Sequence, residues 1–279
     1  MTEPAEVSPA SIAAIRLKVK RSHDQLQWLM NEMESFQVRK PSTYRLVPQV
    51  NAERTEHVFC VEMLEPIPPL WSVVFGEAIH NLCSALDHCV WHLYVDRNRQ
   101  SRKGTHFPIY VTDDDFRKHG RDAIRGIGPG PKAFIKSLQP YPERNETFHR
   151  SLADLVDFWN QDKHRLVHLW GVLFDLSEVE YPIGTFFDPV GGWRVLHDHA
   201  EVFRIITKWP VDKVEVSGPI EARVAIEHFS RKPSGERASL WDLHADVARI
   251  IDALLGSLGR QDDTISPVWP VHGLNAPPF

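Results

Sequence analysis

The chain has 279 residues, of which 42% are hydrophobic and 25% are charged, as in a soluble globular protein with ample material for a core. No apolar run approaches the roughly 18 residues that span a bilayer, and the polar residues 1–9 do not resemble a signal peptide, so we expect no membrane association. A net charge of −5 argues against general polyanion binding, and three cysteines favour the reducing cytoplasm over a disulfide framework.

The first three predicted elements are a helix, a strand pair and a second helix. Ser8 and Pro9 form a helix start, and apolar residues recur at helical spacing from there to 36. Residues 43–64 hold two β-rich runs around a polar turn, which predicts a hairpin ended by a cluster of prolines. The apolar spacing then predicts a helix over about 70–95.

The rest of the chain is predicted to alternate between loop-rich, helical and β-rich parts. Residues 96–145 are rich in loop-forming residues, and a Gly-Pro turn leads into a short helix over 131–138. A long helix is predicted over 146–169. Runs of β-forming residues separated by turns fill 170–230, and the last helix spans about 238–258.

Segregated runs of helices and strands indicate the α+β class. We expect a helical bundle with an N-terminal β-hairpin and a β-rich section before the C-terminal helix. The chain is predicted to form a single domain, 1–279, in which a helical core (9–169 plus 238–258) packs against the β-rich section 170–230. The Pro-rich tail, 260–279, is expected to be loose.

The helix over 70–95 has an unusual polar stripe opposite its apolar seam. The predicted seam consists of Phe75, Ile79, Leu82, Leu86, Val90 and Leu93. At 100° per residue, the stripe gathers side chains that form directed hydrogen bonds, bind metals or move protons, and it holds no Lys or Arg. Its members are Glu77, Asn81, Ser84 and His88, flanked by His80, Asp87 and Trp91. This stripe is the first indication of chemistry in the sequence.

The helix over 146–169 has a comparable polar stripe and one misplaced cation. The stripe consists of Asp154, Asp157, Gln161, His164 and His168, flanked by Asn160 and Arg165. Lys163 falls within the apolar seam of this helix, which consists of Phe148, Leu152, Leu155, Val156, Trp159 and Leu166. Its ammonium either reaches the surface along an extended side chain, or the helix is distorted there, or the lysine is held for a purpose.

The segment 97–136 has a local charge of +6 in an otherwise acidic chain. Its ten cations are Arg97, Arg99, Arg102, Lys103, Arg117, Lys118, Arg121, Arg125, Lys132 and Lys136, against four aspartates. Such a segment suits a phosphate ligand, but a solvated surface loop has the same composition.

Four short sequence elements resemble a pattern found in many uncharacterised bacterial proteins. The pattern reads Gly-Glu-x-x-His-Asn-Leu-Arg-Ser-Ala-Leu-Asp-His, followed by Phe-Pro-Ile, Gln-Pro-Tyr and Asn-x-Asp-Lys-His-Arg. The corresponding residues here are 76–88, 107–109, 139–141 and 160–165, in the same order. Cys83 replaces the arginine of the first element.

The first element is also similar to the Arg-x4-His signature of HEPN domains. This resemblance implies a homodimeric helical bundle that binds RNA or a nucleotide, and a metal-independent endoribonuclease that uses no cofactor. A thiol cannot grip phosphate as a guanidinium does, so Cys83 implies a degenerate or altered enzyme, or one in which another cation takes over.

The resemblance makes His88 the acid/base candidate, and an active enzyme of this kind would need further groups around it. His88 is the expected acid/base, Lys163 or Arg165 would stabilise phosphate charge, and Asn81, Asp87 and His164 would orient these groups. The remaining candidates for ligand binding are polar or basic: Glu77, His80, Ser84, Asn160, Arg97, Arg99, Arg102 and Lys103.

Two other hypotheses use the same residues. In the first, the protein is a metal-dependent helical-bundle enzyme in which histidines one turn apart and a Glu-x-x-His pair bind Zn or Fe. Its candidate ligands are Glu77, His80, His88, His92, His164 and His168. In the second, the polar stripes form a hydrogen-bonded network that fixes helix register, and the protein is a non-catalytic structural or interaction protein.

Overall fold

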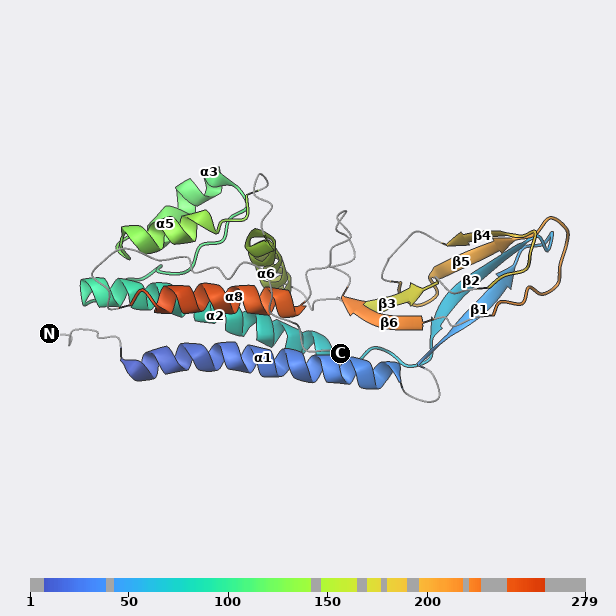
Figure 1. Cartoon of the computed structure of the whole chain (residues 1–279), viewed down its shortest axis with the longest axis horizontal. Helices are drawn as coiled ribbons and strands as arrows, with labels where there is room; N and C mark the ends of the chain where they lie inside the picture. Colours follow the sequence, from blue (N-terminus) through green and yellow to red (C-terminus); the bar gives the residue numbers. More distant parts are fainter. Residues whose placement is uncertain are drawn as a thin grey trace. The chain divides into compact units, whose positions relative to one another are not determined.

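The computed structural model describes residues 8–38, 43–141, 147–164, 170–176, 180–189, 196–217, 221–226 and 240–258, apart from the side chains of a few residues in these ranges. Its helices are α1 (Pro9–Gln37), α2 (Leu70–Asn98), α3 (Asp113–Asp115), α4 (Arg121–Ala123), α5 (Pro129–Ser137), α6 (Thr147–His164) and α8 (Leu240–Leu255), with a π-helical turn, η1 (Phe116–Gly120). Its strands are β1 (Tyr44–Val50), β2 (Glu56–Met63), β3 (Trp170–Asp175), β4 (Phe186–Pro189), β5 (Glu201–Ile206) and β6 (Glu221–Ile226) (Figure 1). The predicted α+β class is confirmed.

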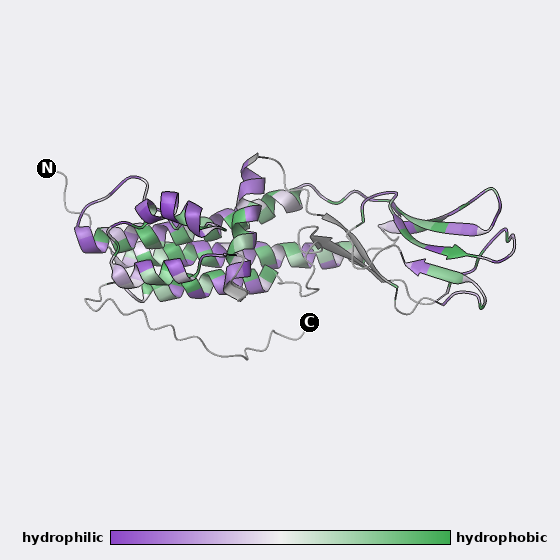
Figure 2. Cartoon of the chain, turned by 90° about the horizontal axis from the view of Figure 1, so that it is seen from above, coloured by the Kyte–Doolittle hydropathy of each residue, from purple (hydrophilic) through white to green (hydrophobic). Residues whose placement is uncertain are grey.

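The long predicted helices lie where the apolar spacing placed them, within a few residues at each described end. Their amphipathic character is visible as hydrophilic and hydrophobic bands side by side on the same helices (Figure 2). Of the described helices, none combines the length and the apolar character that a membrane span requires. The N-terminal position predicted for the hairpin is not confirmed, because the 29-residue helix α1 precedes β1 and β2.

The chain divides into two compact units. The first, which we call the helical unit, comprises Met1–Asp24, Glu77–Lys163 and Ala238–Phe279. The second comprises Gln25–Gly76 and His164–Arg237. The helices α1 and α2 therefore contribute residues to both units. The single domain expected from the sequence stays a prediction.

The helical unit has an apolar core to which α2 contributes a continuous face. Ile79, Leu82, Leu86 and Val90 of α2 are each 1% exposed or less, which matches the predicted seam. Leu152 and Leu155 of α6 and Leu243, Val247 and Ile250 of α8 are also fully buried. Burial of such side chains contributes about 1.5–3 kcal/mol each, so this packing dominates the stability of the unit.

Two polar contacts fix α8 in the helical unit. His244 lies with Nε2 3.2 Å from the carbonyl oxygen of Val19 in α1, and its ring lies 5.4 Å from that of His23. Ser151 of α6 donates a 2.7 Å hydrogen bond to the buried carboxylate of Asp246, which also accepts one from Arg249. These directed bonds select one register of α8 against its neighbours.

The second unit contains an antiparallel sheet of order β1-β2-β5-β4, and a separate antiparallel pair of β3 and β6. The sheet buries one face through alternating residues such as Phe59, Val61, Phe203 and Ile205. On its other face, Arg204 donates hydrogen bonds to the carboxylates of Glu56 and Glu201.

Candidate functional site

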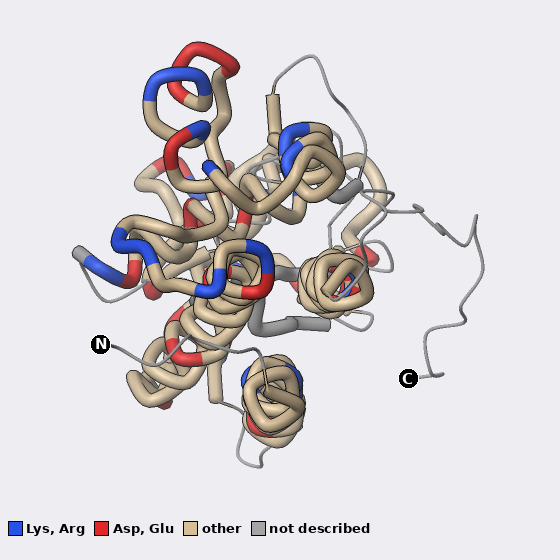
Figure 3. The backbone as a smooth tube through the Cα atoms, turned by 90° about the vertical axis from the view of Figure 1, so that its left-hand side faces the viewer, with Lys and Arg blue, Asp and Glu red and all other residues tan. Residues whose placement is uncertain are grey.

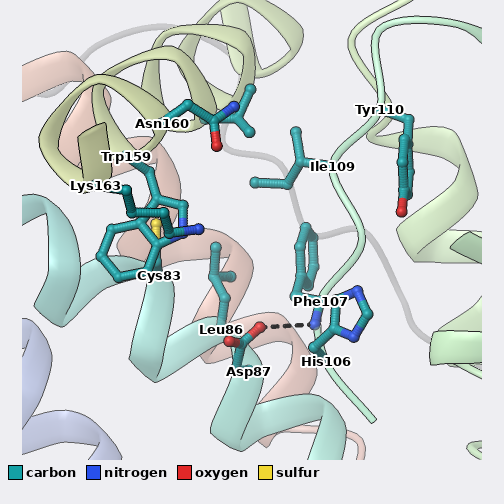
Figure 4. A pocket seen from close by; sticks show the side chains of 11 residues that line it. Cys83, Leu86, Asp87, His106, Phe107, Ile109, Tyr110, Trp159, Asn160 and Lys163 are labelled. Atoms are coloured by element: carbon teal, nitrogen blue, oxygen red, sulfur yellow. Dashed lines mark hydrogen bonds between the residues drawn. The ribbon is translucent and has the colours of Figure 1, made fainter. Parts of the chain in front are cut away.

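A cavity of about 440 Å³ opens in the helical unit between α2, α6 and the extended segment 106–110. Its polar lining residues are Cys83, Asp87, His106, Tyr110, Asn160 and Lys163, and its apolar ones are Leu86, Phe107, Ile109, Val156 and Trp159. Figure 4 shows the α6 side chains on one side, those of the segment 106–110 on the other, and Leu86 and Asp87 of α2 between them. Its volume lies in the range of small-molecule sites, about 300–1,000 Å³.

The helix α2 presents Cys83, Leu86 and Asp87 to the cavity because residues three and four apart share one helix face. Oδ1 of Asp87 accepts a 2.9 Å hydrogen bond from the backbone N–H of Phe107 (Figure 4). Within the described ranges, the Asp87 carboxylate has no other hydrogen-bond partner. It therefore has acceptor capacity left for a ligand.

The environment of Asp87 favours its neutral form. Burial raises the pKa of the Asp87 carboxyl, and the Phe107 N–H, His106, His88 and Lys163 offset only part of that effect. A ligand that donates hydrogen bonds or carries positive charge would lower this pKa again. The carboxyl is thus matched to a donor-rich ligand.

The helix α6 presents Val156, Trp159, Asn160 and Lys163, a spacing that forms one continuous face. Lys163 lies in line with apolar residues of α6 because this part of the helix face lines the cavity. Its ammonium lies 4.3 Å from the centroid of the Trp159 ring, a cation–π contact. Among the described residues, no carboxylate lies within 4.0 Å of this ammonium.

The segment 106–110 is held in place by Gln139, which is completely buried. Its Oε1 accepts a 2.9 Å hydrogen bond from the Tyr110 N–H, and its Nε2 donates to the carbonyl oxygens of Pro108 at 2.8 Å and Ile135 at 3.0 Å. One side chain therefore joins the cavity wall to the end of α5. Gln139 is not among the site residues predicted from the sequence, although it begins the Gln-Pro-Tyr element.

Residues from the four short sequence elements at 76–88, 107–109, 139–141 and 160–165 contribute to this cavity or its wall. Asp87 belongs to the first element and binds the Phe-Pro-Ile element through Phe107. Gln139 begins the Gln-Pro-Tyr element and binds the same wall, while Asn160 and Lys163 belong to the fourth element. Segments separated by up to about 80 residues in the chain thus build one site.

The predicted acid/base, His88, is not among the cavity-lining residues. Burial lowers the pKa of His88, and the ammonium of Lys18 on α1 lowers it further. His92 is buried, its Nδ1 has no hydrogen-bond partner among the described residues, and burial lowers its pKa as well. His80 lies near the cavity, with its ring 4.9 Å from that of Trp159.

The remaining candidates on the two helices lie elsewhere. Glu77 is exposed, and Asn81 and Ser84 are half-buried, but none of the three lines the cavity. The side chain of His164 and the residues Arg165 and His168 lie outside the described part of the chain. The role expected for His164 beside His88 therefore stays a prediction.

The cysteines of α2 are poor nucleophiles. Burial raises the pKa of Cys83 to about 12, and the Asp87 carboxylate acts in the same direction. Burial also raises the pKa of Cys89 to about 12. Because the thiolate is the reactive form, Cys83 lines the cavity as a small, neutral side chain.

Four of the ten cations of the basic segment form ion pairs with its own aspartates among the described residues. The described ion pairs there are Arg102–Asp122, Arg117–Asp113, Lys118–Asp114 and Arg125–Asp122. Arg102 also donates to the backbone carbonyl of Asp122, so it holds the loop together. Arg97, Arg99 and Lys103 are exposed, and basic and acidic stretches adjoin one another in Figure 3.

The described residues contain no group of three His, Cys, Asp or Glu side chains that could hold a metal ion. Two of the six ligands in the metal hypothesis, His164 and His168, have no described side chain.

Comparison with protein-family models, curated proteins and solved structures finds no match for the chain.

Proposed function

We propose that the protein binds a nucleotide, free or as part of RNA, in the cavity between α2, α6 and the segment 106–110. The observation that supports this most directly is the pairing of an acceptor and a cation in one apolar cavity. Asp87 and Lys163 both line it, and they do not form an ion pair with each other. A ligand with a donor-rich end and an anionic end satisfies both groups at once.

A nucleotide has the required combination of groups. Its base is flat and apolar on its faces, which suits walls made by Phe107, Ile109 and Val156. Its phosphate suits the ammonium of Lys163, which acts as a mobile point charge at the exposed side of the cavity. Asn160 adds an amide that donates and accepts.

The cavity supports the binding part of the HEPN-like hypothesis more than the cleavage part. Cleavage requires an acid/base within hydrogen-bond reach of the reacting hydroxyl, and His88 does not line the cavity. We therefore propose a degenerate or altered HEPN-like protein whose retained property is nucleotide binding.

Isothermal titration calorimetry of the full chain with the four ribonucleoside monophosphates tests the proposal. We expect at least one to bind, and Lys163→Met to weaken that binding about tenfold or more, because a hydrogen bond to a charged group is lost. Lys136→Met is the matched control, since Lys136 is an exposed lysine away from the cavity. Absence of binding by all four at millimolar concentration, or equal loss in both variants, would contradict the proposal.

A further inference from the structure

We infer that this cavity selects guanine over the other bases, and that Asp87 makes the selection. The inference rests on the proposed nucleotide binding and adds the identity of the base. Asp87 is a side chain of the cavity that is anchored by a backbone N–H and left with acceptor capacity.

The position of the Asp87 carboxylate is fixed before any ligand arrives. The Phe107 N–H holds Oδ1 at 2.9 Å, and the rigid helix α2 holds the other end of the side chain. A carboxylate that is already oriented loses little entropy when it accepts further hydrogen bonds. In the ionised form it offers acceptors alone.

The four bases differ in what their Watson–Crick edges offer such an acceptor. Guanine presents two adjacent donors, N1–H and the 2-amino group. Adenine and cytosine present one amino donor beside a ring-nitrogen acceptor, and uracil presents one N–H between two carbonyl oxygens. An acceptor held against a carboxylate leaves both buried groups unsatisfied, which is the costly arrangement. Guanine alone avoids it.

The rest of the lining is compatible with this orientation. Asn160 and Lys163 lie on α6, across the cavity from Asp87 (Figure 4). The amide of Asn160 can donate to an acceptor of the ligand, such as O6 of guanine, and Lys163 is left for the phosphate. The Asp87 carboxylate thus complements the donor edge of guanine, the Asn160 amide its carbonyl, and the Lys163 ammonium the phosphate.

The selection should depend on pH, because a protonated Asp87 presents one donor and one acceptor and then matches adenine better than guanine. Burial raises the pKa of the Asp87 carboxyl. The groups that act on it are His88 on α2, Lys163 on α6, and His106 and the Phe107 N–H in the segment 106–110. Selectivity for guanine is therefore expected to decline as the pH falls through the Asp87 pKa.

Calorimetric titration of the full chain with GMP, IMP and AMP at pH 7.5 tests the inference without any substitution. IMP retains N1–H but lacks the 2-amino group, so it should bind about tenfold more weakly than GMP, and AMP should bind more weakly still. Asp87→Asn provides one donor and one acceptor and should remove the preference for GMP over AMP. Asp252→Asn, an exposed aspartate of α8 away from the cavity, should keep it.

The outcomes separate this inference from the proposed function. Equal affinities for GMP and AMP in the unaltered protein, with binding still weakened by Lys163→Met, would overturn the selection and leave nucleotide binding standing. Binding by none of the nucleotides would overturn both. Circular dichroism and thermal unfolding of Asp87→Asn establish that it is folded, and the IMP comparison decides the matter even if it is not.

Discussion

Replacement of Gln139, the buried glutamine at the cavity wall, should lower the free energy of unfolding strongly, although the substitution changes no charge. Gln139→Leu keeps the approximate size of the side chain but removes one acceptor and both donors. The Tyr110 N–H and the Pro108 carbonyl then lose their described partner in the cavity wall, and the Ile135 carbonyl loses one at the end of α5.

The magnitude follows from these three bonds. A buried polar group left unsatisfied costs about 1–3 kcal/mol. The carbonyl of Ile135 lies in the last turn of α5, so we count only the two groups in the cavity wall. We therefore expect the free energy of unfolding to fall by about 2–6 kcal/mol.

Urea unfolding of the two proteins, followed by circular dichroism, measures this difference, and hydrogen exchange of the Tyr110 amide reports it locally. Gln27→Leu is the control, because Gln27 is exposed and bonds only Asn31 one turn away, so its effect should stay within about 0.5 kcal/mol. If Gln139→Leu proves as mild as the control, and the Tyr110 amide stays protected, Gln139 does not hold the wall and our account of the cavity fails.

Three further predictions concern ionisation. Burial raises the pKa of Asp246, so the difference in unfolding free energy between wild type and Asp246→Asn should depend on pH. The stabilisation of wild type should be complete below about pH 3.8 and decrease as the pH rises through the raised pKa. A constant difference from pH 3 to 7 would contradict this. Burial lowers the pKa of His244, so the stabilisation of wild type relative to His244→Leu should be complete above about pH 6.5 and be lost as the pH falls through the lowered pKa. Thermal unfolding of both proteins at pH 5 to 8 measures this. With pKa values of about 12, Cys83 and Cys89 should resist a disulfide reagent at pH 8 until urea unfolds the protein; rapid labelling of either in the native state would show that burial does not control it.

The sequence predicted the helices well because apolar residues recur every three to four positions along each of them. The seam of Ile79, Leu82 and Leu86 is buried as expected. Lys163 was the best local indication of the site, since a cation within an apolar seam needs a reason, and the cavity supplies it.

The rest of the site could not be predicted from periodicity. Gln139 and Tyr110 lie in irregular segments, and they meet through hydrogen bonds between residues 29 positions apart. No local pattern encodes such a contact. His88 and Asp87 are adjacent in sequence, but one helical step of 100° leaves only Asp87 in the cavity lining, so a motif that names both does not tell which one meets the ligand.

The hydrogen bond between Asp87 and the Phe107 N–H makes the backbone of the segment 106–110 a reporter of the cavity's contents. Any ligand that donates hydrogen bonds to the Asp87 carboxylate must also change the strength of its bond to the Phe107 N–H. The amide resonance of Phe107 would then shift on occupancy even without movement of the chain, and a partner that contacts the segment 106–110 could distinguish the filled protein from the empty one.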